Sequence, residues 1–134
     1  MKKIVLIEDN PDHADLITEA LGEGGTEEKV ILVRDGMEAI DYFQELGAKR
    51  NEQIENKIKL IILDLNLPKV SGMDVLKFLK KNPKYSKIPV VIFSASSDQE
   101  TIDEADKNGA NGYLVKPAFH EEFVEKVKIL KKCY

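Results

Sequence analysis

The chain has 134 residues, of which 43% are hydrophobic and 33% are charged, and its formal net charge at pH 7 is −4. These values predict one soluble globular domain, residues 1–134, that is large enough to bury a core. They argue against a general nucleic-acid-binding surface, which would be basic, and no apolar run reaches the ~20 residues of a membrane span. The one cysteine, Cys133, excludes an intrachain disulfide. We therefore expect a cytoplasmic protein with no nucleic-acid or membrane partner.

The predicted elements begin with a strand, and short apolar runs of the same kind recur along the chain. The runs are continuous rather than alternating and are rich in Val and Ile, which is typical of parallel strands covered on both faces. In chain order they are "IVLI" (4–7), "VILV" (30–33), "LIIL" (60–63), "VVIF" (90–93) and "GYLV" (112–115).

Segments with the apolar spacing of amphipathic helices follow the strands. The segment 98–108 offers only Ile102 and Ala105 to a core, so we expect its helix to be the most weakly held. The lysines within 77–87 and within 126–132 are interpreted as solvated helix faces. The other predicted apolar faces are Ala14, Ile17, Ala20 and Leu21; Ala39, Ile40, Phe43 and Leu46; Met73, Leu76 and Leu79; and Phe119, Phe123, Val127 and Leu130.

Capping residues mark several predicted helix starts. Asn10 followed by Pro11 is typical of an N-cap and first helical residue. Ser71 and Ser97 each stand three residues before an acidic residue, which is the spacing of a capping box. The polar stretch 47–59 fits either an extension of the second helix or a surface loop.

The alternation of strands and helices predicts an α/β fold of the (βα)5 type, with right-handed crossovers and a parallel sheet. In open sheets of this class, ligands bind beyond the carboxyl ends of the strands, where the strand order reverses. In the order 2-1-3-4-5, the first and third strands are neighbours at that point. We therefore expect the residues that follow these two strands to meet.

Polar and charged residues follow four of the predicted strands. The second strand ends in an ordinary turn, Arg34-Asp35-Gly36, which agrees with a place at the outer edge of the sheet. The other strands are followed by Glu8 and Asp9, by Asp64 and Asn66, by Ser94, and by Lys116 and Pro117.

Glu8, Asp9 and Asp64 would repel one another in one cleft, because two unit charges ~4 Å apart cost roughly 4 kcal/mol at an effective dielectric near 20. Either one carboxyl group takes up a proton or a cation joins them. An all-oxygen site with few ligands suits Mg²⁺. Lys116 and Ser94 would supply a positive charge and a hydroxyl donor for an anion with three oxygens. A carboxylate flanked by such groups can attack phosphorus and form an acyl phosphate.

Each of these residues has an ordinary explanation when it is taken alone. An acidic pair after a strand is commonly a capping turn, a serine there is commonly a cap, and a lone lysine commonly lies at the surface. Four strand ends with complementary chemistry in the right order favour one functional site instead.

Four motifs, "LIEDN", "LDLNLPKVSG", "FSAS" and "GYLVKP", resemble those of the receiver domains of two-component response regulators, and the resemblance covers essentially the whole chain. It implies a flavodoxin-like sheet in the order 2-1-3-4-5 with helices on both faces. It also implies a signalling switch rather than an enzyme with a free substrate. The phosphoryl group would come from a sensor histidine kinase in a Mg²⁺-dependent reaction that the receiver itself catalyses, with slow autodephosphorylation afterwards.

The resemblance assigns a role to each residue of the predicted site. Asp64 is similar to the phospho-acceptor of the family, and Asp9 to a direct Mg²⁺ ligand. Glu8 would act mainly through metal-bound water, and the backbone carbonyl of Asn66 would be a further ligand. Lys116 would hold the phosphoryl group and attract the side chain of Asp64.

The resemblance also extends to Ser94, Tyr113 and Pro117, of which the first two match residues that transmit the signal. Ser94 matches the hydroxyl residue that moves to bind a phosphoryl oxygen, and Tyr113 matches the aromatic residue whose ring then turns inward. An ordinary half-buried aromatic side chain on an edge strand is the alternative for Tyr113. Pro117 would follow a cis peptide bond.

The resemblance also implies partners. No further domain follows the last predicted helix, so we expect a stand-alone receiver. The motif "DLNLPK" and the stretch 47–59 resemble the small regulators paired with bacterial phytochromes, which suggests a phytochrome-like kinase. The fourth helix, fifth strand and fifth helix would form the face that signals, and in the family this face often serves as a homodimer interface. His13 and His120 are interpreted as surface helix residues.

Three alternatives belong to other classes. A Mg²⁺-dependent phosphohydrolase with an aspartyl nucleophile typically carries a second aspartate two residues later, where this chain has Asn66. A flavin or nucleotide binder needs a glycine- or hydroxyl-rich phosphate loop after the first strand, where this chain is acidic. A receiver-like scaffold that no longer takes phosphate would have lost acceptor-site residues, and all of them are present.

Overall fold

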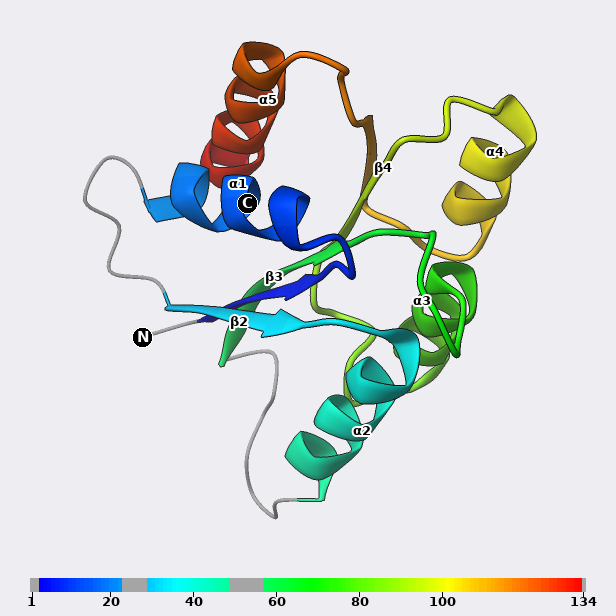
Figure 1. Ribbon diagram of the computed structural model, residues 1–134. Coiled ribbons are helices and arrows are strands. Elements are labelled where there is room, and N and C mark those ends of the chain that lie inside the picture. Colours follow the sequence, from blue (N-terminus) through cyan, green and yellow to red (C-terminus); the bar gives the residue numbers. More distant parts are fainter. Residues whose placement is uncertain (1–2, 23–28, 49–56, 134) are drawn as a thin grey trace.

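A computed structural model of the protein describes residues 3–22, 29–48 and 57–133 (Figure 1). Each strand contains the apolar run that was predicted for it. The strands are β1 (Lys3–Ile7), β2 (Lys29–Val33), β3 (Ile58–Leu63), β4 (Val90–Ser94) and β5 (Gly112–Val115). The helices are α1 (Pro11–Gly22), α2 (Gly36–Gly47), α3 (Gly72–Lys81), α4 (Gln99–Lys107) and α5 (His120–Cys133).

The strands form one parallel sheet in the order β2-β1-β3-β4-β5, as predicted. The register pairs Ile7, the last residue of β1, with Val33 on one side and with Leu63 on the other. The carboxyl ends of the three strands are therefore level. Residues that directly follow β1 and β3 emerge side by side at this edge of the sheet.

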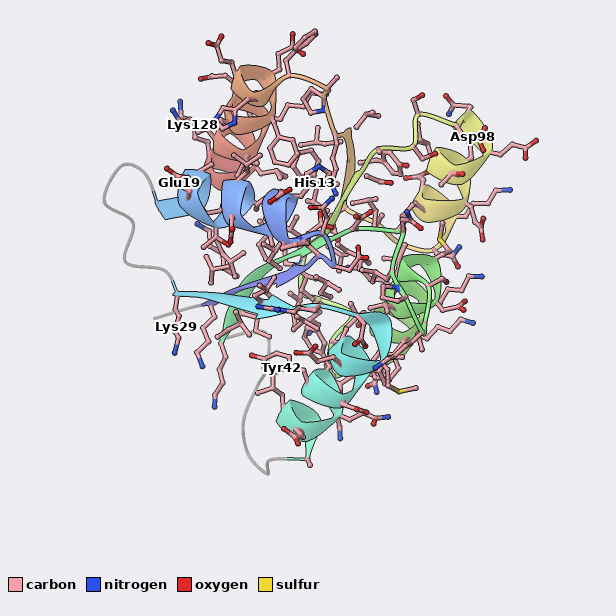
Figure 2. The ribbon with its side chains drawn as sticks, in the orientation of Figure 1. His13, Glu19, Lys29, Tyr42, Asp98 and Lys128 are labelled. Carbon is pink, nitrogen blue, oxygen red and sulfur yellow. The ribbon has the colours of Figure 1, made fainter. Side chains whose placement is uncertain are left out.

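Two hydrophobic clusters bury the two faces of the sheet. On one face, Val5 and Ile7 of β1 belong to a cluster with residues of α2, α3 and α4. On the other face, Ile4 and Leu6 belong to a cluster with residues of α1 and α5. Figures 1 and 2 show helices on both sides of the sheet and side chains filling the space between. Burial of both faces explains why the strands read as continuous apolar runs. No helix in the described ranges has the length and hydrophobicity of a membrane span.

Two of the predicted helix caps are confirmed. The Asn10 Oδ1 atom accepts hydrogen bonds from the amides of Asp12 and His13 at 3.0 and 3.2 Å. The Ser71 Oγ atom accepts one from the amide of Asp74 at 3.2 Å. These side chains satisfy amides that have no partner within the helix, and so they fix where α1 and α3 begin.

The predicted cap at Ser97 is wrong, because α4 starts one residue later. Asp98 precedes the helix, and no side-chain cap hydrogen bond is found for it among the described residues. The Asp98 amide instead donates to Ser96 Oγ at 3.3 Å. Because α4 buries only Ala105, the light packing predicted for this helix is confirmed.

Lys80 is not a solvated residue, and this part of the sequence interpretation is wrong. Its Nζ atom donates to the carbonyls of Ser86 and Ile88 at 3.1 and 2.9 Å and to Asn111 Oδ1 at 2.8 Å. The lysine thus joins α3 to the segment before β4 and to the start of β5. Burial lowers the pKa of its ammonium group from the ordinary value.

The stretch 47–59, for which the sequence left a helix extension or a surface loop open, joins α2 to β3. Helix α2 ends at Gly47, and β3 begins at Ile58. Residues 49–56, on which the choice between a helix and a loop depends, lie outside the described residues.

Gly72 allows the start of α3 to lie directly against the end of β3. Its amide donates to the carbonyl of Leu65 at 3.0 Å. A Cβ atom at this position would overlap backbone atoms of Asp64 and Leu65. The loop that carries Asp64 therefore depends on the absence of a side chain at residue 72.

We predict that Gly72→Ala lowers the free energy of unfolding by about 1–3 kcal/mol, because the backbone must move to admit the methyl group. Gly22→Ala is the matched control, since a Cβ there meets no described atom within 4 Å. Its change should stay within about 0.5 kcal/mol, as for an ordinary surface substitution. Urea unfolding followed by circular dichroism measures both variants. Equal losses of unfolding free energy in the two would contradict the need for a glycine at residue 72.

Candidate functional site

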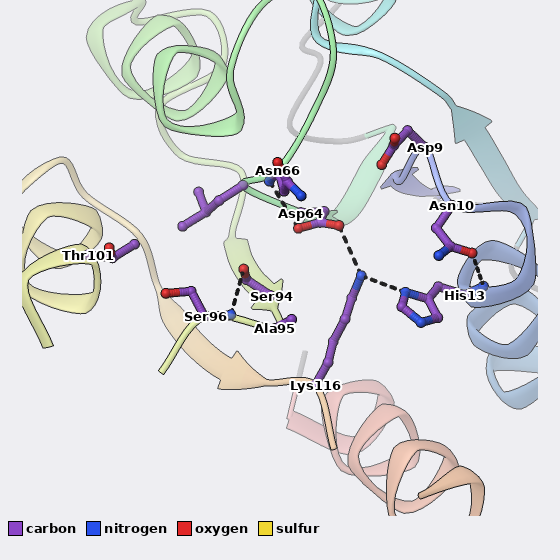
Figure 3. A pocket seen from close by; sticks show the side chains of 11 residues that line it. Asp9, Asn10, His13, Asp64, Asn66, Ser94, Ala95, Ser96, Thr101 and Lys116 are labelled. Atoms are coloured by element: carbon purple, nitrogen blue, oxygen red, sulfur yellow. Dashed lines mark hydrogen bonds and ion pairs between the residues drawn. The ribbon is translucent and has the colours of Figure 1, made fainter. Parts of the chain in front are cut away.

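A cleft of about 500 Å³ opens at the carboxyl edge of the sheet. It gathers residues from the ends of β1, β3, β4 and β5 and from the first turns of α1 and α4 (Figure 3). Its lining residues are Asp9, Asn10, His13, Asp64, Leu65, Asn66, Ser94, Ala95, Ser96, Thr101 and Lys116.

Backbone hydrogen bonds that continue the sheet place the site's charged residues. The amide of Glu8 donates to the carbonyl of Val33 at 2.9 Å, and the amide of Asp64 donates to that of Ile7 at 3.0 Å. The amide of Lys116 likewise donates to the carbonyl of Ser94 at 2.7 Å. Glu8, Asp64 and Lys116 therefore each directly follow a strand, and their amides still take part in the hydrogen bonding of the sheet.

The predicted crowding of Glu8, Asp9 and Asp64 is present in the structure. One oxygen from each carboxyl group lies within 4.8 Å of the other two. Glu8 and Asp64 are buried, with 2% and 7% exposure, whereas Asp9 is exposed. The carboxyl cluster is thus shielded from solvent at Glu8 and Asp64 and accessible to solvent at Asp9.

The ammonium group of Lys116 lies among these carboxylates, and its side chain is only 4% exposed. Its Nζ atom donates to Glu8 Oε1, to Asp64 Oδ2 at 2.9 Å and to His13 Nδ1 at 3.1 Å. An ammonium group has three N–H donors, so all of them are engaged. A buried charge needs such partners, because desolvation alone would make it unfavourable.

Glu8 is the carboxyl group whose proton affinity changes most clearly. Its pKa is raised to about 7, mainly by burial, while the hydrogen bond from Lys116 opposes the rise and nearby Asp64 adds to it. Burial, and then the charge of Lys116, lower the pKa of His13 from its ordinary value. The 4.0 Å approach of His13 Nδ1 to Glu8 would be an ion pair only with a protonated imidazole, which the lowered pKa disfavours.

Asp64 presents its carboxylate to the cleft with both oxygens engaged. The Oδ1 atom accepts a hydrogen bond from the amide of Asn66 at 3.1 Å, and Oδ2 accepts one from Lys116. These contacts orient a group that still lines an open space. Asn66 lies in the same lining, and a role for its carbonyl as a metal ligand stays a prediction.

Ser94 and Tyr113 are linked through one residue, Ser96. The Ser94 side chain lines the cleft, and its Oγ atom accepts a hydrogen bond from the Ser96 amide at 3.3 Å. The Tyr113 hydroxyl donates to the Ser96 carbonyl at 2.8 Å. Tyr113 is half-buried on the edge strand β5. A shift of Ser94 would therefore reach the tyrosine through a single residue, Ser96.

The peptide bond before Pro117 is trans, so the predicted cis bond is wrong. All peptide bonds among the described residues share this form. A trans bond before proline is favoured by about 0.5–1 kcal/mol. With this trans bond, the Lys116 amide still extends the hydrogen bonding between β4 and β5.

Two residues of the cleft were missed or misread in the sequence. His13 was interpreted as a surface residue, but it lines the cleft and contacts Lys116. Its spacing of four residues from the buried Ile17 places both on one face of α1, which is a signal that could have found it. Thr101 brings the first turn of α4 to the cleft, and only the fold shows this proximity.

The three carboxylates suit a small divalent cation. Bonds of ~2.1 Å to Mg²⁺ put opposite oxygen ligands ~4.2 Å apart, which is close to the spread of the cluster. Glu8, Asp9 and Asp64 offer only oxygen ligands, and the exposed Asp9 leaves room for water. These donors fit a magnesium-type site better than one for a soft metal.

Known proteins resemble this chain over nearly all of its length. The family model of the response regulator receiver domain matches residues 4–128. The probable methanogenesis regulatory protein FilR2 of Methanothrix harundinacea is 35% identical over 132 residues, which are 98% of this chain and 82% of that protein.

Two solved structures show the same similarity in three dimensions. The phosphorylated cyanobacterial phytochrome response regulator RcpA has a TM-score of 0.87 and 38% identity, over 98% of this chain and 91% of that one. The Mn²⁺-bound form of response regulator Rcp1 has a TM-score of 0.87 and 30% identity, over 98% and 93%. The resemblance to phytochrome response regulators that the sequence indicated is confirmed.

We predict that, without divalent cations, the free energy of unfolding of the wild type falls between pH 5 and pH 8 relative to that of Glu8→Gln. The folded pKa of Glu8 is about 7, against an ordinary value of 4.5, so the folded state binds the proton more tightly. This contribution is present below pH 4.5 and is lost as the pH rises through 7. Its size should be on the order of 1–3 kcal/mol.

Urea unfolding in the presence of a chelator measures this difference at each pH. Glu19→Gln, at an exposed position on α1, is the control and should follow the wild type. A wild type and Glu8→Gln variant that change in parallel would contradict a raised pKa for Glu8.

Proposed function

The chain belongs to the response regulator receiver domain family, and we propose that it accepts a phosphoryl group on Asp64 from a sensor histidine kinase in the cytoplasm. The observation that carries this proposal is the position of Asp64. Its carboxylate lines the cleft, bonded to the Lys116 ammonium and next to Glu8 and Asp9. A phosphorylated relative, RcpA, supports the same chemistry.

Asp64 acts as the nucleophile in this proposal. One of its oxygens forms a bond to phosphorus while the bond from phosphorus to the donor nitrogen breaks, and the product is an acyl phosphate. Lys116 stays paired with the negative charge that the phosphoryl group brings. The protein is a signalling switch, because the group that is modified belongs to the chain itself.

Glu8, Asp9 and Asp64, with the carbonyl of Asn66, are the residues that would hold Mg²⁺. When bound, the cation would neutralise negative charge on the phosphoryl oxygens. A relative with Mn²⁺ bound supports a divalent cation at this kind of site. Asp9 is the exposed member, so its side chain can adjust as ligands arrive.

The signal would leave the site through Ser94. A phosphoryl group adds up to two negative charges, which attract the Ser94 hydroxyl. The backbone of Ser96 would then carry the shift to Tyr113, whose hydroxyl donates to the Ser96 carbonyl at 2.8 Å. The lightly packed α4 is the element that can respond, because only Ala105 is buried in it and few contacts hold it in one arrangement.

The face formed by α4, β5 and α5 would be the readout and a homodimer interface. Phe119, at the start of α5, is 71% exposed, and Ile129 on that helix is 53% exposed. Large apolar side chains at the surface are typical of contact sites. The kinase would be phytochrome-like, in keeping with the phytochrome regulator RcpA among the relatives.

We predict that a small phosphodonor with Mg²⁺ adds one phosphoryl group to the protein, as measured by intact mass. Asp64→Asn should abolish the added mass because the nucleophile is gone. A chelator should reduce the addition by at least about tenfold, which corresponds to ~1.4 kcal/mol of lost transition-state stabilisation.

Asp41→Asn is the matched control, since Asp41 is an exposed aspartate on α2 away from the cleft. It should be phosphorylated like the wild type. Continued phosphorylation of Asp64→Asn would show that another residue is the acceptor.

A further inference from the structure

His13 is the third acceptor of the Lys116 ammonium and the one that carries no charge. Its Nδ1 atom lies 3.1 Å from Lys116 Nζ, which also donates to Asp64 (Figure 3) and to Glu8. An ammonium group can only donate, so Nδ1 is the unprotonated nitrogen and the proton is on Nε2. The contact is therefore a directed hydrogen bond.

The imidazole ring is fixed from two sides. The His13 amide donates to the Asn10 cap at 3.2 Å, which sets the first turn of α1. The ring packs on Phe123 of α5, with 5.4 Å between the ring centroids, and Phe123 packs on Phe93 at 5.0 Å. A ring held by a helix start and an aromatic pair can in turn hold the lysine.

The other two acceptors of Lys116 take part in the proposed chemistry. Phosphorylation converts a carboxylate oxygen of Asp64 into the bridging oxygen of an acyl phosphate, and Glu8 belongs to the acidic cluster that a cation would share. His13 lies outside that set of carboxylates. Its hydrogen bond can persist while the bonds to Glu8 and Asp64 change.

We propose that His13 is a positioning residue that holds the Lys116 ammonium toward Asp64 during phosphoryl transfer. This inference rests on the proposed function of Asp64. Without His13 Nδ1, the flexible lysine stem would be free to move its charge toward solvent. With it, the positive charge stays where the negative charge of the phosphoryl group arrives.

Two substitutions separate the acceptor atom from the ring. In His13→Asn, the Oδ1 atom can take the place of Nδ1, whereas His13→Phe keeps a ring against Phe123 and removes the acceptor. His120→Phe is the control, because His120 is the exposed histidine at the start of α5. His13→Leu provides a second variant without an acceptor if His13→Phe fails to fold.

The first measurement is phosphorylation by a small phosphodonor at saturating Mg²⁺. We expect the maximal rate to fall about tenfold in His13→Phe, as for the loss of a hydrogen bond to a charged group, and less than about threefold in His13→Asn. His120→Phe should match the wild type. Equal rates in His13→Phe and the wild type, or equal losses in His13→Phe and His13→Asn, would overturn the proposal.

The second measurement needs no phosphorylation. A ¹H–¹⁵N spectrum of lysine ammonium groups should show a slowly exchanging Lys116 signal in the wild type and in His13→Asn, assigned by its loss in Lys116→Arg. The signal should broaden or vanish in His13→Phe, and an unchanged signal there would contradict the proposal. If the wild type takes no phosphoryl group, the proposed function fails, and this spectrum alone decides whether His13 positions Lys116.

Discussion

The hydrogen-bonded ammonium of Lys116 is the interaction that the site depends on, because it lies where buried carboxylates crowd together. Glu8 and Asp64 are both buried, and each accepts a hydrogen bond from it. Two carboxylates ~4 Å apart would otherwise repel by roughly 4 kcal/mol at an effective dielectric near 20. The site thus keeps an acidic cluster ready for a cation and a nucleophile ready for phosphorus.

The sheet supplies the precision that this charge arrangement needs. Glu8, Asp64 and Lys116 each extend a strand ladder by one amide hydrogen bond, so their backbones cannot drift apart. Gly72 lets α3 close directly behind Asp64. The responsive part lies elsewhere: α4 buries one residue, and Ser96 links Ser94 to Tyr113. A rigid acceptor beside a lightly held helix is an arrangement in which a local charge can move a distant surface.

Much of this could be predicted from the sequence, because strand ends in a parallel sheet share one edge. Asp64 and Lys116 were found by that rule, although they are 52 residues apart. Contacts between helices and loops were not predictable in this way. Lys80 carries the same side chain as its solvated neighbours, and only the fold shows its three acceptors. His13 was misread because it lies on a helix, so the rule for strand ends did not point to its contact with Lys116.

Chemical mapping of the acyl phosphate identifies the residue that received the phosphoryl group. Borohydride reduces an aspartyl phosphate to homoserine and releases phosphate, and peptide mass spectrometry then reads the modified position. We expect homoserine at residue 64 alone, in protein treated with phosphodonor and Mg²⁺. Homoserine at Asp9 or at any other aspartate, or none in protein that has gained a phosphoryl group, would contradict it.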